Sequence, residues 1–145
     1  MENILTRDGY KIKFATDGEC VNANEGEVAI AIDDGETHTL GGKVAYANEG
    51  GLACAYKGGM VYAVEGGEAI AYRGGAAIAL KDGMAYAEAG GVATAHKGGL
   101  VYAHKGGVVY AHKGGTAIVY KGGEATAEEG GEAFALEGGK VHILG

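Results

Sequence analysis

The chain has 145 residues, of which 30 are glycine, with no proline, tryptophan, serine or glutamine and a formal net charge of -7. This bias is typical of one repeat-built domain, and it excludes serine hydrolases because no serine is available as the nucleophile. The excess of carboxylates argues against general nucleic-acid binding, which needs clustered lysine and arginine to neutralise phosphates.

Residues 1–25 depart from the repeat that follows, and we predict that they cap one end, with a candidate hairpin in the segment DGYKIKFATDGE. They contain no basic segment followed by an apolar run of signal-peptide length, and about 18 consecutive apolar residues occur nowhere in the chain. We therefore expect no signal peptide, no membrane partner, and a cytoplasmic location or a place in a virion. Cys20 and Cys54 have no CxxC or Cys/His spacing and are predicted to be free thiols.

Residues 26–145 follow an eight-residue repeat, or octad, whose positions we label a to h, with the consensus G-G-x-A-x-A-x-K/E. Positions c to g alternate with period two and are rich in tyrosine, valine, isoleucine and threonine, which predicts one short strand per octad. Positions h, a and b are predicted to form a sharp corner, because glycine reaches positive φ without steric cost. Strands stacked with a fixed corner make an all-β fold, a β-solenoid.

Positions d and f are predicted to face the interior, because they hold almost only alanine and valine while c, e and g vary widely. A packed interior tolerates little change in volume. Two flat sheets close best on a thin core of alanine, which favours a two-sided, 16-residue coil made of two octads. A three-sided, 24-residue coil and an intertwined trimeric β-helix stay open as alternatives. The 24-residue coil would stack an aromatic column of His38, Tyr62, Tyr86, Tyr110 and Phe134.

In every other octad from Val28 to Val108, position c is apolar, which gives one predicted face of the solenoid an apolar surface. We interpret this face as an association surface, because it is too large to leave in water. Its predicted residues are Val44, Tyr46, Met60, Tyr62, Ile78, Val92, Val108 and Tyr110. At the C-terminus, Val141, Ile143 and Leu144 replace the consensus residues and predict an open strand edge that docks or joins another copy.

His96, His104 and His112 occupy the outward position g, each followed by lysine. On a 16-residue coil, His96 and His112 would stack one coil apart, with His104 on the opposite face. We interpret the three as solvated repeat surface, with His96 and His112, and separately His142, as the candidate metal ligands. No cofactor is expected, and no enzymatic activity, since no phosphate-binding glycine motif occurs and a regular solenoid offers no cleft for acid–base chemistry.

The octad GGxAxAxK covers about 120 of the 145 residues and resembles the octapeptide repeats of β-solenoid segments in phage tail and spike proteins. The resemblance implies the architecture and a structural role. We therefore expect a non-catalytic rod that self-associates, as a phage or virion-like component or a small cytoskeletal polymer. The alternative is an acidic binding module, such as a DNA mimic that engages a basic protein partner.

Overall fold

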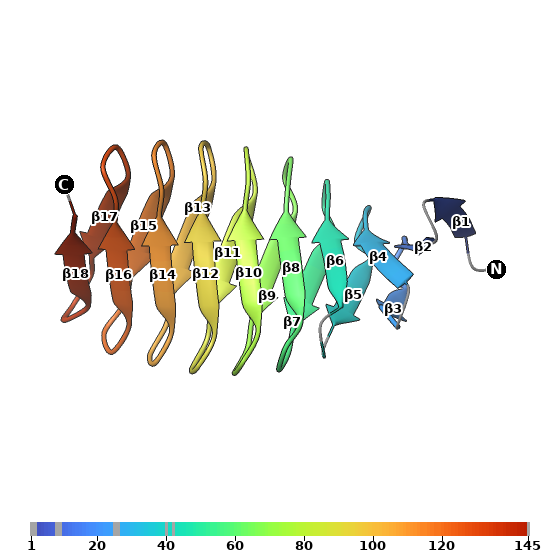
Figure 1. Ribbon diagram of the computed structural model, residues 1–145, viewed down its shortest axis with the longest axis horizontal. Coiled ribbons are helices and arrows are strands. Elements are labelled where there is room, and N and C mark those ends of the chain that lie inside the picture. The colour runs from blue at the N-terminus through green and yellow to red at the C-terminus, as the bar shows by residue number, and fades with distance from the viewer. Residues whose placement is uncertain (1–2, 8–9, 25–26, 40, 42, 145) are drawn as a thin grey trace.

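The computed structural model describes residues 3–7, 10–24, 27–39, 41 and 43–144. Within these ranges every regular element is a strand, and the strands lie side by side along a rod with the two termini at opposite ends (Figure 1). The predicted all-β fold is confirmed: the chain is a parallel β-solenoid of about eight turns. The described residues include no helix with the length and hydropathy needed to cross a membrane.

Two sheets form the two sides of the rod, and the chain passes from one to the other at each corner. Sheet A contains, in spatial order, β1 (Asn3–Arg7), β2 (Tyr10–Ala15), β4 (Glu27–Ala31), β6 (Val44–Ala47), β8 (Met60–Ala63), β10 (Ala76–Ala79), β12 (Val92–Ala95), β14 (Val108–Ala111), β16 (Glu124–Ala127) and β18 (Lys140–Ile143). Sheet B contains β3 (Cys20–Asn22), β5 (Glu36–Thr39), β7 (Leu52–Ala55), β9 (Glu68–Ala71), β11 (Met84–Ala87), β13 (Leu100–Ala103), β15 (Thr116–Val119) and β17 (Glu132–Ala135).

One coil of the solenoid consists of two octads. Each strand from β2 onward pairs in parallel with the strand one coil further along, so that Val44 lies beside Met60 and Met60 beside Ala76. The two-sided, 16-residue coil is therefore confirmed, and the 24-residue coil and the intertwined trimer are wrong. The aromatic residues at 24-residue spacing form no column, because they alternate between the sheets: Tyr62 lies on β8 of sheet A and Tyr86 on β11 of sheet B.

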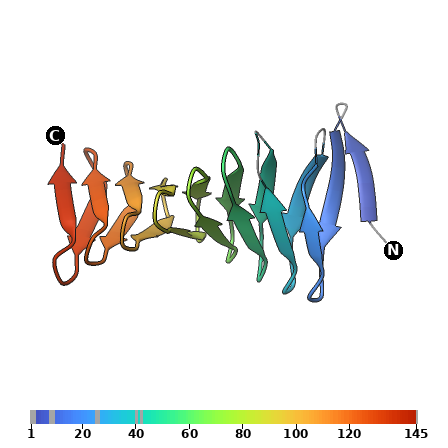
Figure 2. The ribbon, with the colours of Figure 1, turned by 90° about the horizontal axis from the view of Figure 1, so that it is seen from below.

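The core consists of small side chains from the inward positions of both sheets. Figure 2 shows the ribbon of the rod from below, turned by 90° from Figure 1. As predicted, positions d and f face inward, and from Ala29 to Ala127 their side chains are at most 1% exposed. Thr37 and Thr39 on β5 also point inward, and neither hydroxyl has a hydrogen-bond partner among the described residues. Alanine suits this interior because the two sheets lie too close together for every layer of the core to hold a larger side chain.

Where a corner holds two glycines, they serve different purposes, which corrects the prediction that both supply positive φ. At position a, Gly66 has φ of +89°, the left-handed conformation that glycine adopts most easily. At position b, Gly67 is not among the residues with positive φ. A Cβ there would instead overlap the carbonyl group of Ala47 in the preceding coil. Asp34 and Asp82 replace glycine at position a, where aspartate tolerates positive φ. Near the N-terminal end, Glu27 and Lys43 stand at position b instead of glycine.

At the N-terminal end, β1 pairs antiparallel with β2, and β2 pairs in parallel with β4 in the same 16-residue register as the rest of the ladder. Both strands lie within the predicted cap of residues 1–25. An ion pair fastens this end: Lys13 Nζ lies 2.6 Å from Glu27 Oε2, and both side chains are largely buried. The hydrogen bond from Lys13 lowers the pKa of the Glu27 carboxyl below its usual value of 4.5.

Candidate functional site

The outward face of sheet A carries the predicted association surface. All eight predicted residues lie there, at positions c and e of β6, β8, β10, β12 and β14. Their side chains are half-buried or just exposed, with Met60 at 36% and Tyr110 at 37%. These two rows contain no charged residue from Ile12 on β2 to Tyr110 on β14. We call these two rows, over these seven strands, the charge-free face.

Side chains on the charge-free face support one another along the rod. The rings of Tyr46 and Tyr62 stack with centroids 5.1 Å apart, and the Tyr62 hydroxyl donates to the Met60 sulfur at 3.2 Å. Stacking between neighbouring strands is a favourable cross-strand contact. The side chains of the charge-free face therefore contact one another and form ordered rows.

A row of charged residues borders this face at the corners that lead from sheet A to sheet B. Successive corners are joined by backbone hydrogen bonds, for example from Asp17 N to Asp33 O at 2.8 Å and from Glu65 N to Lys81 O at 3.0 Å. We call this set of exposed position-h residues the first corner row. Its members, in order, are Asp17, Asp33, Glu49, Glu65, Lys81, Lys97, Lys113 and Glu129. Four acids are thus followed by three lysines, one residue per coil.

The opposite corners, leading from sheet B to sheet A, carry a second corner row with a different charge pattern. Its exposed position-h residues include Lys57, Arg73, Lys105 and Lys121, interrupted by the neutral Ala89 and followed by the acidic Glu137. The rod therefore has one edge of mixed sign and one edge that is mainly basic.

The C-terminal end of the ladder is apolar and exposed. On β18, Val141 is half-buried and Ile143 is 77% exposed, and Leu144 follows at 55%. Phe134 on the neighbouring β17 is also exposed. Val141 and Ile143 lie on the last strand of sheet A and Leu144 directly follows it, where the open edge was predicted. Whether this edge joins another copy stays a prediction.

The candidate histidine ligands lie where a 16-residue coil puts them. The rings of His96 and His112 stack with centroids 4.9 Å apart and planes 15° from parallel, and His104 lies on the other side of the rod. His112 Nδ1 also lies 2.7 Å from Glu128 Oε2. Because stacked rings present their faces to each other, this pair does not direct two nitrogen atoms at one point. His142 lies exposed on β18. The metal hypothesis for these three residues stays a prediction.

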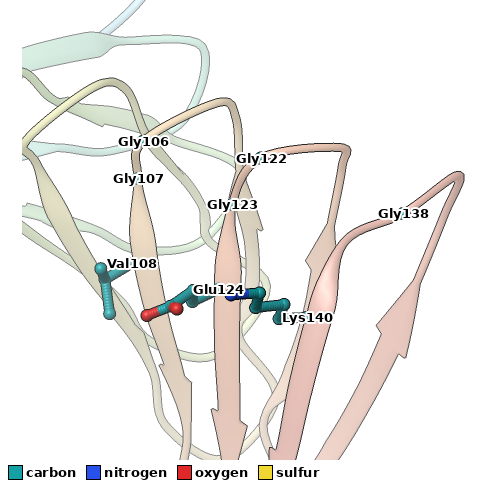
Figure 3. A pocket seen from close by; sticks show the side chains of 8 residues that line it. All are labelled: Gly106, Gly107, Val108, Gly122, Gly123, Glu124, Gly138 and Lys140. Atoms are coloured by element: carbon teal, nitrogen blue, oxygen red, sulfur yellow. The ribbon is translucent and has the colours of Figure 1, made fainter.

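A groove of about 230 Å³ runs along the corners near the C-terminal end (Figure 3). Most of its lining residues are corner glycines. Val108, Glu124 and Lys140 contribute the side chains that line it. One carboxylate and one ammonium group on an open groove make no set of nucleophile and base.

A cluster of a different kind lies on sheet B, near the N-terminal end. Glu36, His38 and Cys54 each offer one potential metal-ligating atom, and these atoms all lie within 4.8 Å of one another. From the sequence we predicted only a free thiol for Cys54 and missed this cluster. The signal that finds it is the coil length, because Cys54 stands one coil after His38 and is its direct partner on the ladder.

The cluster is partly shielded from water. Cys54 is only 3% exposed, and burial raises the pKa of its thiol to about 11. Tyr56, two residues further along, is also desolvated by its neighbours, which raises the pKa of its hydroxyl. A hollow of about 330 Å³ opens beside the cluster, lined by Asn22, Asn24, His38, Lys43 and Tyr56, among others. His38 is therefore reachable from solvent, whereas Cys54 beside it on the ladder is buried.

No family model matches the chain, and no curated protein matches it. A solved structure with some similarity is the crystal structure of the TibC-catalysed hyper-glycosylated TibA55-350 fragment. The alignment covers 91% of this chain and 80% of that one, at 20% identity and a TM-score of 0.26. At this level the likeness says nothing about function. Of the predicted resemblance to phage repeat segments, only the architecture is confirmed, by the parallel β-solenoid of the structure itself.

Proposed function

We propose that this protein is a non-catalytic structural rod whose copies associate through the charge-free face of sheet A. The single observation that carries the proposal is the absence of charge in two outward rows over seven strands, from Ile12 to Tyr110. At a ladder spacing of about 4.8 Å, seven strands make an apolar strip about 30 Å long. Contiguous apolar surface of this kind on a regular scaffold is typical of association sites.

The first corner row supports a second copy of the same chain as the partner. If two rods pack face to face with opposite directions, the same row of both copies lies along one side of the interface. The two-fold axis of this arrangement lies in the interface and runs along the strand direction. The charge-free faces overlap fully when the axis runs along β8, their middle strand. Asp33 then meets Lys97 of the other copy and Glu49 meets Lys81. Each copy supplies the acids for the other's lysines, which is the self-complementarity that a two-fold dimer requires.

Among the corner residues that the structure describes, like charges meet in this arrangement only at the axis itself. There Glu65 faces Glu65 of the other copy, and on the second corner row Lys57 faces Lys57. Both side chains are exposed at the edge of the rod, where water screens them. The opposite-sign pairs on either side of the axis therefore determine the orientation.

Parallel packing in register fits the charges less well. It would place the first corner row beside the second, so that residues at the two ends of the same strand meet. Lys81 would lie near Arg73 of the partner and Lys113 near Lys105, each contact occurring twice. Like charges across an interface suppress that arrangement, because charge complementarity selects orientation more than it adds affinity.

The antiparallel pair is a building unit suited to a particle component or a small filament, inside a cell or in a virion.

The alternative function, an acidic module that mimics DNA, needs carboxylates at regular intervals along one edge. The first corner row supplies four of them and then reverses sign at Lys81, Lys97 and Lys113. This change of sign makes the row self-complementary. It also leaves a single basic partner no continuous acidic edge to bind.

The test is the oligomeric state of the whole chain by analytical ultracentrifugation, with Tyr62→Glu as the disrupting variant. Placing a charge on the charge-free face should shift the protein to monomer at concentrations where the unchanged chain is dimeric. Tyr102→Glu is the matched control, since Tyr102 occupies the same repeat position on sheet B and also stacks on its neighbours. A monomeric unchanged chain, or equal effects of both variants, would overturn the proposal.

A further inference from the structure

We propose that Glu36, His38 and Cys54 form a binding site for one divalent transition-metal ion of the zinc class. This site lies on sheet B, away from the charge-free face of sheet A, and it goes beyond the structural role proposed above. Three features support it: the place of the three side chains, the hydrogen bonding of the imidazole, and the chemistry of the ligand set.

The fold brings the three residues together in two ways. Glu36 and His38 stand at positions c and e of β5, so that their side chains leave the same face of one strand. Cys54 stands at position e of β7, directly beside His38. Glu36 Oε1 lies 2.7 Å from His38 Nε2, and the Cys54 sulfur completes a triangle in which no two ligand atoms are more than 4.8 Å apart. Atoms at such separations can converge on one ion with small side-chain rotations.

The imidazole of His38 is oriented for ligation through Nε2. Its other nitrogen, Nδ1, lies 3.0 Å from the Tyr56 hydroxyl, and the two rings stack with centroids 5.6 Å apart. A ligating histidine almost always hydrogen-bonds through its second nitrogen to an oxygen atom, which sets the tautomer and the direction of the ring. Tyr56 supplies that oxygen here, and it leaves Nε2 on the side of Glu36 and Cys54.

The ligand types select the metal. Thiolate, imidazole and carboxylate together suit zinc, whereas calcium and magnesium prefer oxygen ligands alone. Three protein ligands leave the fourth tetrahedral position for water, since the Glu36 and His38 side chains are 42% and 23% exposed. Cys20 is the ladder partner of Glu36 on the preceding strand and is exposed. It therefore provides a second thiol nearby that this three-ligand site does not need.

The experiment uses Co²⁺ as the probe, added to the full chain with its thiols reduced. A cobalt–thiolate bond produces a charge-transfer absorption that carboxylate and imidazole ligands do not give. We expect one equivalent of Co²⁺ to produce this band and Zn²⁺ to remove it by displacement. Cys54→Ser should abolish the band, while Cys20→Ser, the matched thiol control, should leave it intact. Tyr56→Phe should weaken binding by about 10-fold, as is usual when a supporting hydrogen bond to a ligand is removed.

A further control separates this site from the stacked pair on sheet A: His112→Ala should leave the stoichiometry and the band unchanged, whereas His38→Ala should weaken binding. Circular dichroism of each variant establishes that the solenoid still folds. The proposal is overturned if the unchanged chain gives no charge-transfer band. It is also overturned if Cys54→Ser retains the band, or if Cys20→Ser loses it.

Discussion

The carbonyl oxygen of Ala47 occupies the space that a Cβ on Gly67 would need. Ala47 ends β6 of sheet A, and Gly67 closes the corner before β9 of sheet B, so this contact joins one coil to the next. Gly66, the preceding residue, is different: it has φ of +89°, and the atom nearest to a Cβ there would be 3.8 Å away. Position b is restricted by space, and position a by backbone conformation.

This difference predicts unequal costs for two neighbouring substitutions. Gly66→Ala should lower the free energy of unfolding by about 1–2 kcal/mol, the usual cost of a left-handed conformation in a residue with a Cβ. Gly67→Ala should cost more, about 3 kcal/mol, because the backbone of a neighbouring coil must move. Urea denaturation followed by circular dichroism measures both. Equal losses at the two positions would show that conformation alone explains the glycine pair.

Thr39 offers a prediction in the opposite direction. Its side chain is 1% exposed and its hydroxyl has no hydrogen-bond partner among the described residues. Thr39→Val keeps the shape and removes the unpaired polar group, so it should raise the free energy of unfolding by about 1–2 kcal/mol. Thr126→Val, at an outward and half-buried position of β16, is the matched control and should change stability little. If Thr39→Val destabilises the protein instead, the hydroxyl has a partner such as ordered water.

The Lys13–Glu27 pair makes the N-terminal end sensitive to acid. Because the folded state lowers the pKa of Glu27, the pair stabilises the protein fully above the ordinary value of 4.5. That stabilisation is lost as the pH falls through the lower folded value. Glu27→Gln should therefore reduce stability at pH 6 and have a much smaller effect near pH 3. Urea denaturation at both pH values measures this difference, and an equal loss at both would contradict it.

The antiparallel dimer predicts a charge-reversal result. Asp33→Lys and Lys97→Glu should each weaken self-association several-fold, because each places like charges together at two symmetry-related points. Combining them in one chain should restore the affinity, since every pair is again of opposite sign. Sedimentation at low salt measures the dissociation constants, and the differences should shrink at 1 M salt, where charges are screened within about 3 Å.

The matched control for this cycle is Arg73→Glu on the second corner row. In the antiparallel arrangement Arg73 lies opposite the uncharged Gly41 of the other copy, so its reversal should change the dissociation constant little. A double variant that is as weak as the single ones would rule out the pairing of Asp33 with Lys97. The charge-free face would then associate in a different orientation.

Much of the fold was predictable from the sequence because the repeat constrains each position in a different way. Alternation over positions c to g identified the strands, and the monotony of alanine at d and f identified the inside. The coil length followed from the thinness of that core, whereas the aromatic spacing from His38 to Phe134 pointed to a longer coil and was misleading. Position e holds aromatic residues in so many octads that several spacings occur together.

The separate roles of the corner glycines were not predictable, since both positions hold the same residue. Only the stacking of coils shows that Gly67 lies against Ala47. The same reason explains the missed cluster on sheet B. His38 and Cys54 are neighbours only once the coil length is known, and no local motif relates them. A comparison of residues one coil apart, applied to the whole chain, would have placed them side by side.

The two-octad coil also limits how the length of this protein can change in evolution. Gain or loss of two octads adds or removes one complete coil and leaves each later residue on its own sheet. Gain or loss of a single octad would transfer every later strand to the opposite side of the rod, carrying Tyr110 from sheet A to sheet B. Variants of this chain should therefore differ by even numbers of octads, although the visible unit of the sequence is a single one.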